Sequence, residues 1–165
     1  MVVVVAAHVA DGGAWDMEKG YGVRIENTIT INRPVETVFA FVTNVANTPR
    51  YASTVIEAQQ TSPGALAEGT TLRMVGKFLG KRLDTAYRVT AYEPNRTFAY
   101  ESISGPVPQS WRASFEQVPA GTRCTVTVEA DAGGVVRLAG PVLSGMIKRQ
   151  GDADLSTLKR LLESE

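Results

Sequence analysis

Few residues of this 165-residue sequence could act in nucleophilic catalysis or bind a metal. It contains one cysteine, Cys124, and one histidine, His8. A single cysteine excludes an internal disulfide and a cysteine-based zinc cluster. Because His8 lies far along the chain from every other candidate group, we expect neither a histidine-based triad nor a transition metal held by the protein. We therefore predict no metal site and no cofactor.

Tyrosines and one carboxylate are the remaining candidates for proton transfer. In an apolar pocket, a tyrosine hydroxyl or a carboxylate with a raised pKa can donate or accept a proton. If the protein is an enzyme, we predict Tyr87, Tyr100 and Asp154 to be catalytic, and Gln150 to orient the substrate by hydrogen bonding. Three arginines are poor candidates, because strand alternation or a nearby turn directs them outward: Arg73, Arg82 and Arg112.

A long C-terminal helix must position Gln150 and Asp154. Apolar residues recur there at steps of three or four, which predicts one buried face: Leu143, Ile147, Gly151, Leu155, Leu158 and Leu162. Gln150 and Asp154 lie within or at the edge of this apolar face. From Val142 to Glu163 the helix would be roughly 33 Å long, at about 1.5 Å per residue. Since proline disrupts helical hydrogen bonding, we expect a short first piece and then a break or kink at Pro141.

Most of the chain before this helix predicts antiparallel strands. The stretch from about Val23 to Ile31 alternates apolar and polar residues, which is typical of a half-buried strand. Further strands, separated by tight turns, are predicted at 53–61, 70–78, 82–92, 96–102, 109–118 and 122–130. Pro34 begins a short amphipathic helix after the first strand. Residues 44–50 predict a loop or a second helical turn.

The order of these elements predicts an α+β fold. A curved antiparallel sheet with one apolar face needs a cover, and the long helix is the only element of the right size. We predict that the space between them is a ligand-binding cavity lined by Phe41, Met74, Tyr87, Tyr100, Trp111, Phe115, Met146 and Gln150. Methionine and tyrosine suit an adaptable wall with polar tips. The alternative is that these side chains simply pack on one another as core.

Composition limits the partners and the compartment. Lys+Arg and Asp+Glu each number 17, so nothing favours a nucleic acid or an anionic membrane surface. No apolar run approaches the roughly 18 residues that span a bilayer. Residues 2–7 are apolar but lack the basic residues that precede the apolar core of a signal peptide, so we prefer a flexible extension or an extra edge strand to an export signal. We expect one domain, residues 23–165, after an extension of residues 1–22, in a cytoplasmic monomer or weak homodimer.

The stretch 29–44 reads Ile-Thr-Ile-Asn-Arg-Pro-Val-Glu-Thr-Val-Phe-Ala-Phe-Val-Thr-Asn. It resembles the opening of the polyketide cyclase/dehydrase-like branch of the START-like (SRPBCC) superfamily. Further matches follow in that family's order: Gly69-Thr70, Tyr92-Glu93-Pro94-Asn95-Arg96, Ser104-Gly105-Pro106, Phe115-Glu116, Gly121-Thr122-Arg123 and Ala153-Asp154-Leu155…Leu158-Lys159. The resemblance covers Val23 to about Leu162 and depends on the order and spacing of these motifs. One departure is Tyr51, where the family commonly has tryptophan; it alters the packing of the cavity but not the fold.

The resemblance implies a helix-grip fold, in which two short helices follow the first strand and a curved sheet wraps around the C-terminal helix. The space enclosed is an apolar cavity. Members of the superfamily mostly bind lipids, sterols or polycyclic aromatics, and some cyclise polyketides. They share no universal catalytic residue, so the resemblance implies an architecture more directly than an activity.

Three functional classes are open. The first is a binding or carrier protein for a small hydrophobic molecule, and the second is a polyketide cyclase or dehydratase acting in the same cavity. The third is a protein-interaction module that uses the exposed charged face of the last helix. Without a histidine, an activated cysteine or a metal set in the pocket, binding is favoured over catalysis. Asp154 has its own alternative, because it could simply reach water or pair with an arginine of a strand.

Overall fold

The structure is a computed structural model that describes residues 23–78, 80–130 and 134–164. The elements within these residues follow in the order β1 (Val23–Ile31), α1 (Val35–Thr43), the 3₁₀ helix η1 (Val45–Asn47), α2 (Thr48–Tyr51), β2 (Val55–Gln60), β3 (Thr71–Phe78), β4 (Lys81–Glu93), β5 (Thr97–Ser104), β6 (Gln109–Val118), β7 (Gly121–Ala130) and α3 (Gly134–Ser164). The predicted extension, residues 1–22, lies outside the described residues, and the domain boundary after it stays a prediction.

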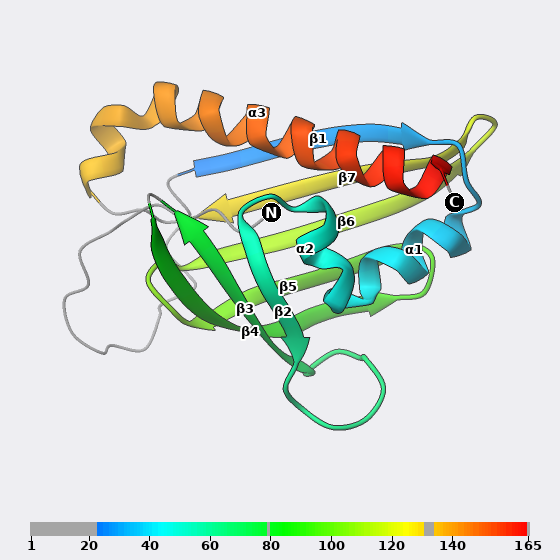
Figure 1. The fold of residues 1–165 in the computed structure, drawn as a ribbon, viewed down its shortest axis with the longest axis horizontal. Helices are drawn as coiled ribbons and strands as arrows, with labels where there is room; N and C mark the ends of the chain where they lie inside the picture. Colours follow the sequence, from blue (N-terminus) through cyan, green and yellow to red (C-terminus); the bar gives the residue numbers. More distant parts are fainter. Residues whose placement is uncertain (1–22, 79, 131–133, 165) are drawn as a thin grey trace.

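The strands form one seven-stranded antiparallel sheet in the order β1-β7-β6-β5-β4-β3-β2. Strands from β2 to β7 are neighbours in sequence order because short connections join antiparallel strands. The sheet curls, α3 lies along β1, and α1 and α2 cover one end of the curl (Figure 1). This arrangement confirms the predicted α+β helix-grip fold.

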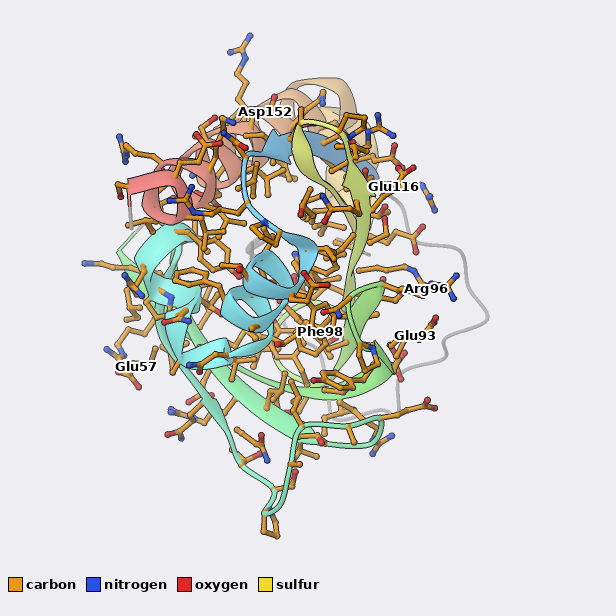
Figure 2. All side chains as sticks on the ribbon, turned by 90° about the vertical axis from the view of Figure 1, so that its right-hand side faces the viewer. Glu57, Glu93, Arg96, Phe98, Glu116 and Asp152 are labelled. Atoms are coloured by element: carbon orange, nitrogen blue, oxygen red, sulfur yellow. The ribbon has the colours of Figure 1, made fainter. Side chains whose placement is uncertain are left out.

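Strand alternation separates an apolar inner face of the sheet from a charged outer face. On β6, Trp111 and Phe115 are buried, whereas Arg112 and Glu116 are exposed. The end-on view of Figure 2 shows Phe98 of β5 pointing into the interior and Glu116 pointing outward. Burying the inner face removes its apolar surface from water, which is the main force that holds the sheet against its cover.

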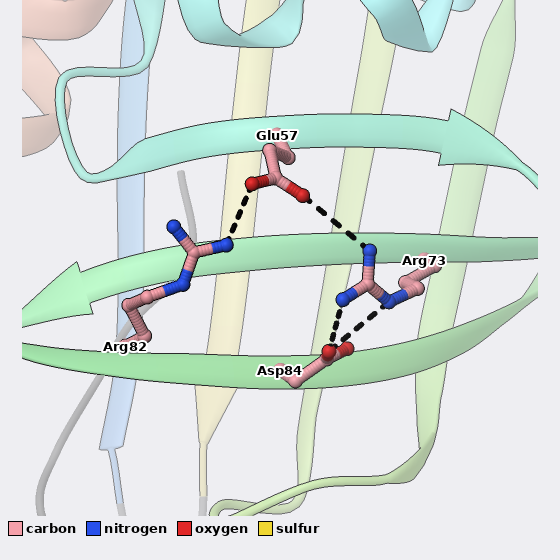
Figure 3. A network of polar contacts seen from close by, with 4 residues as sticks. All are labelled: Glu57, Arg73, Arg82 and Asp84. Atoms are coloured by element: carbon pink, nitrogen blue, oxygen red, sulfur yellow. Dashed lines mark hydrogen bonds and ion pairs between the residues drawn. The ribbon is translucent and has the colours of Figure 1, made fainter.

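Four charged side chains form a network on the outer face of β2, β3 and β4 (Figure 3). Glu57 lies 2.6 Å from Arg82 and 3.5 Å from Arg73, and Arg73 also pairs with Asp84. The four side chains are 36–59% exposed, so water screens their attraction and the network contributes little stability. Arg73 and Arg82 therefore lie outside the interior, as strand alternation predicts.

A close contact joins the middle of α3 to the edge strand β1. Asn27 of β1 is 2% exposed, and its amide nitrogen donates to the carbonyl of Lys148 at 3.0 Å and to Asp152 Oδ1 at 2.6 Å. The backbone of Gly151 approaches so closely that an added Cβ would lie 2.4 Å from Asn27 Oδ1. Glycine is therefore required at 151 for α3 to reach β1.

The C-terminal end of α3 is held by polar contacts to the end of β1. Lys159 Nζ donates to the carbonyl of Thr30 at 2.7 Å and to Glu163 Oε1 at 2.6 Å. The same carboxylate oxygen accepts a hydrogen bond from the backbone amide of Asn32 at 2.7 Å. The hydrogen bond from Lys159, followed by that from Asn32, lowers the pKa of Glu163. Helix α3 thus runs alongside β1 and in the same direction.

The helix continues without interruption from Gly134 to Ser164, so the predicted break at Pro141 is absent. Figure 1 shows its first turns inclined to the rest, in agreement with a proline-induced bend. The predicted apolar face is buried at Gly151, Leu155, Leu158 and Leu162 and half-buried at Ile147, whereas the side chain of Leu143 lies outside the described residues. No described helix is long and apolar enough to cross a membrane.

We expect Gly151→Ala to lower the free energy of unfolding by about 1–3 kcal/mol, because the new methyl group displaces Asn27 or the helix. Gly145→Ala is the matched control: a Cβ at this exposed position of the same helix meets no atom within 4 Å. Alanine there should raise stability by up to about 1 kcal/mol through helix propensity. Urea unfolding measures both changes. Equal effects of the two substitutions would contradict the close contact.

The contacts of Glu163 predict a pH-dependent contribution to stability. Its pKa in the folded protein lies below the ordinary value of 4.5, so its contribution is present above pH 4.5 and is lost as the pH falls through the folded value. Glu163→Gln should therefore unfold at lower urea concentration than wild type at neutral pH. The difference should shrink as the pH falls through the folded pKa of Glu163, below which both side chains are neutral. A difference that stays constant with pH would argue against the ionic role.

Candidate functional site

Aromatic side chains of β4, β5 and β6 form a continuous wall on the inner face of the sheet. Tyr100 and Trp111 are register partners, and their rings stack with centroids 4.9 Å apart. The ring of Tyr87 meets that of Tyr100 edge-on at 5.1 Å, and Phe98 lies 5.9 Å from Trp111. Each of these side chains is at most 5% exposed. We call Tyr87, Phe98, Tyr100 and Trp111 the aromatic wall.

The structure brings three predicted cavity residues, Tyr87, Tyr100 and Trp111, into contact within the aromatic wall. Two others are buried beside it: Met74 on β3 is 1% exposed, and Phe115 on β6 is 6% exposed. The signal that identified all five was strand alternation, which places every second side chain on the same face.

The hydroxyl groups of the wall are buried and stay protonated. Burial raises the pKa of Tyr87, and hydrogen bonds with Thr85 and Gln109 offset this only in part. The Tyr87 oxygen accepts a bond from Gln109 Nε2 at 2.8 Å. Burial, and then the proximity of Tyr51 and Tyr87, raises the pKa of Tyr100 well above its ordinary value. These groups can donate hydrogen bonds but are poor general bases at neutral pH.

Gln109 is a site residue that the sequence analysis missed. It is 5% exposed and lies two positions before Trp111 on β6, so the alternation that identified Trp111 also directs Gln109 inward. Its backbone amide donates to Ser102 Oγ at 2.9 Å. The alternation of inward and outward residues along β6 could therefore have identified Gln109 as a buried polar residue beside Tyr87.

Asp154 and Gln150 hold α3 against the turn between α2 and β2. Asp154 is 4% exposed, and its Oδ1 accepts hydrogen bonds from the backbone amide and the hydroxyl of Ser53 at 3.2 and 3.1 Å. Gln150 Nε2 donates to the same oxygen at 2.9 Å and also to Ser53 Oγ. We call this set of bonds the Ser53 latch. Asp154 pairs with no strand arginine in it, and the latch gives the carboxylate a structural role.

Tyr51, the departure from the family pattern, is a buried tyrosine of α2. It is 7% exposed. Burial raises the pKa of its hydroxyl, a hydrogen bond with Thr48 lowers it, and the nearby Cys124 and Asp154 raise it further. Tyr51 in turn helps to raise the pKa of Tyr100, so these buried groups act on one another electrostatically.

The remaining predicted cavity residues lie at the margins of this region. Phe41 is half-buried and its ring lies 6.3 Å from that of Tyr51. Gln150 is half-buried in the latch. Met146 is 58% exposed, one helical turn before Gln150 on the same face of α3. The structure therefore brings Met146 to the surface next to the latch rather than into the buried wall.

A separate groove of about 710 Å³ opens at the end of the molecule where α1 lies. It is lined by α1, η1, β2, the β2–β3 loop and the end of β4 with the turn after it. Its apolar side chains include Phe39, Leu66 and Tyr92. No predicted cavity residue is among the described residues that line it. Sequence periodicity did not identify this groove, because five separate segments of irregular and regular structure combine to form it.

The described residues include no group of three histidine, cysteine, aspartate or glutamate side chains that could hold a metal ion.

Residues 22–163 match the model of a family described as polyketide cyclase/dehydrase and lipid transport. The chain belongs to this family. This assignment agrees with the resemblance of residues 29–44 and of the motifs that follow them, and it includes both α3 and the aromatic wall.

Solved structures of several distant relatives share the fold. A START superfamily protein from Mycobacterium smegmatis has a TM-score of 0.73 at 15% identity, over 86% of this chain and 97% of that one. The Zhui aromatase/cyclase from Streptomyces sp. R1128 has a TM-score of 0.69 at 18% identity, over 86% and 93% of the two chains. A protein from Thermus thermophilus has a TM-score of 0.71 at 17% identity, over 86% and 98%. No curated protein matches the sequence. At these identities the likeness shows the fold, not the activity.

Cys124 faces the interior on β7, where it is 1% exposed and burial raises its pKa to about 12. A thiol in this state is a weak nucleophile. We expect Ellman's reagent to modify Cys124 at least about a hundredfold more slowly in the native protein than in guanidinium chloride, since modification requires opening of the sheet. Equal rates in the two conditions would contradict the burial of this thiol.

Proposed function

We propose that the protein binds a small hydrophobic molecule, a lipid, a sterol or a polycyclic or polyketide-like compound, between α3 and the aromatic wall. The observation that carries the proposal is the combination of flat aromatic surface with neutral hydroxyls in one buried region. Apolar contact supplies affinity at roughly 25 cal/mol per Å² buried. A few convergent polar groups then orient one end of the ligand, which is the usual composition of a small-molecule site.

The contacts of α3 suggest where such a ligand enters. The Ser53 latch and the bonds to β1 hold the helix from its middle to its C-terminal end. Met146 lies just before the latch and exposes 58% of its surface. We therefore place the entrance beside Met146, where an apolar ligand would cover this side chain.

An enzyme of cyclase type, with Tyr87, Tyr100 and Asp154 as its candidate catalytic groups, is the second candidate function. It is supported by the fold shared with the Zhui aromatase/cyclase. The raised pKa values of both tyrosines favour hydrogen-bond donation over proton abstraction, so binding is the better-supported function.

A cytoplasmic location and a monomeric or weakly dimeric state stay predictions from the sequence.

Tryptophan emission tests the proposal directly. The chain has two tryptophans, so Trp15→Phe leaves Trp111 as the reporter within the aromatic wall. Titration with fatty acids, sterols and polycyclic aromatics should shift or quench its emission for at least one class. Tyr87→Phe, made in that background, should weaken a polar-ended ligand by about fivefold, the value of one neutral hydrogen bond, and leave a pure hydrocarbon unchanged.

Tyr92→Phe is the matched control, because Tyr92 lines the groove beside α1. It should leave binding unchanged. If Tyr92→Phe weakens binding and Tyr87→Phe does not, the ligand occupies the groove instead of the space at the wall. If no class changes the emission, an interaction module becomes the better interpretation. Consumption of a bound polyketide that stops in Tyr87→Phe would identify an enzyme.

A further inference from the structure

The carboxylate of Asp154 uses only one of its two oxygens in the Ser53 latch. Oδ1 accepts all three hydrogen bonds of the latch. Oδ2 is buried and has no hydrogen-bond partner among the described residues. It is the one buried side-chain nitrogen or oxygen in the described part of the chain with this property. The latch therefore explains why Asp154 is present in the helix but not why a second acceptor oxygen is buried with it.

A buried acceptor without a donor is costly. Leaving such a group unsatisfied costs roughly 1–3 kcal/mol, and more for a charged group. An asparagine could have made the latch with its single carbonyl oxygen, without burying a carboxylate. Natural structures leave few buried polar atoms unpaired, and such an atom calls for a specific explanation. One such explanation is a ligand that supplies the missing hydrogen-bond donor to Oδ2.

Asp154 faces the interior of the protein, next to the turn between α2 and β2. Asp154 lies on the same helical face as Gln150 and Met146, at successive intervals of four residues. Tyr51, whose pKa Asp154 helps to raise, is buried on the neighbouring helix α2. The unpaired oxygen is therefore a buried acceptor on the α3 side of the proposed ligand region.

The charge of the latch determines which ligand group fits. Its three donors are a backbone amide, a hydroxyl and a side-chain amide, all of them uncharged. They stabilise the carboxylate without neutralising it. A ligand hydroxyl can donate to Oδ2 and form a charge-assisted bond, which is stronger than a bond between neutral groups. A ligand carboxylate would bring a like charge to the same place.

We propose that Asp154 makes the protein selective for apolar molecules that carry a hydroxyl group, such as phenols and sterols, and selective against apolar carboxylates such as fatty acids. The inference rests on the proposed function and narrows its ligand class. Asp154 is a specificity-determining residue in this role, and its second oxygen is the acceptor.

Three probes that share one ring system test the selectivity: 2-naphthol, 2-methoxynaphthalene and 2-naphthoate. Isothermal titration calorimetry with the full wild-type chain should give 2-naphthol a dissociation constant about tenfold or more below that of 2-methoxynaphthalene, which cannot donate. 2-Naphthoate should bind more weakly than both. A wild-type protein that binds naphthol and its methyl ether equally would overturn the inference, and no variant is needed for that result.

Asp154→Asn isolates the second oxygen. Its carbonyl can keep the three bonds of the latch, while its amide replaces the acceptor with a donor. The naphthol preference should fall to less than about threefold. Asp152→Asn is the matched control, because it removes the same charge from an exposed position of the same helix and retains an acceptor for Asn27. It should keep the wild-type preference.

The outcomes separate the inference from the function on which it rests. An unchanged preference in Asp154→Asn, or a wild-type preference for the methyl ether, would overturn the role of Asp154 and leave a hydrophobic site in place. If Asp152→Asn loses the preference for 2-naphthol to the same extent, the effect comes from the general charge of the helix. That result would also overturn the role of Asp154. Failure of all three probes to bind wild type would remove the proposed function and the inference together.

Discussion

The contact between Gly151 and Asn27 is the constraint on which the arrangement of the molecule depends. An apolar, curled sheet must be covered, and α3 can approach its edge strand only where a side chain is missing from the helix. Asn27 then satisfies its amide on the helix backbone and on Asp152. Because Lys159 and Glu163 extend this attachment to the end of β1, the helix is held along one edge of the sheet.

Attachment at one edge leaves the opposite side of the helix to be closed by something else. The Ser53 latch provides this closure near the middle of α3, through the turn that leads into the other edge strand, β2. Between these attachments lies the inner face with its aromatic wall. The ligand region that we propose lies between α3 and this wall, and Met146 of α3 is exposed.

Patterns with a short period predicted most of the fold. Alternation located β6 at Gln109–Val118 and the inner position of Trp111, because a strand has only two faces. The path of α3 through Pro141 could not be predicted, since a proline can bend a helix or end it and packing decides which. Asn27 has the parity of the inward residues of β1, yet its bonds depend on a glycine 124 positions later in the sequence.

The candidate site was predictable in part for the same reason. Gln150 and Asp154 were recognisable as polar residues on an apolar helical face. Their partner Ser53 was predicted to begin a strand, but it lies in the turn before β2. The most direct test of a site between α3 and the wall uses the four methionines, whose ¹³C-methyl resonances can be assigned by Met→Leu substitution. Saturation with a bound hydrophobic ligand should shift the signals of both Met74 and Met146, which lie on the sheet and on the helix. If neither signal moves while the ligand is bound, the site lies elsewhere and the central claim is contradicted.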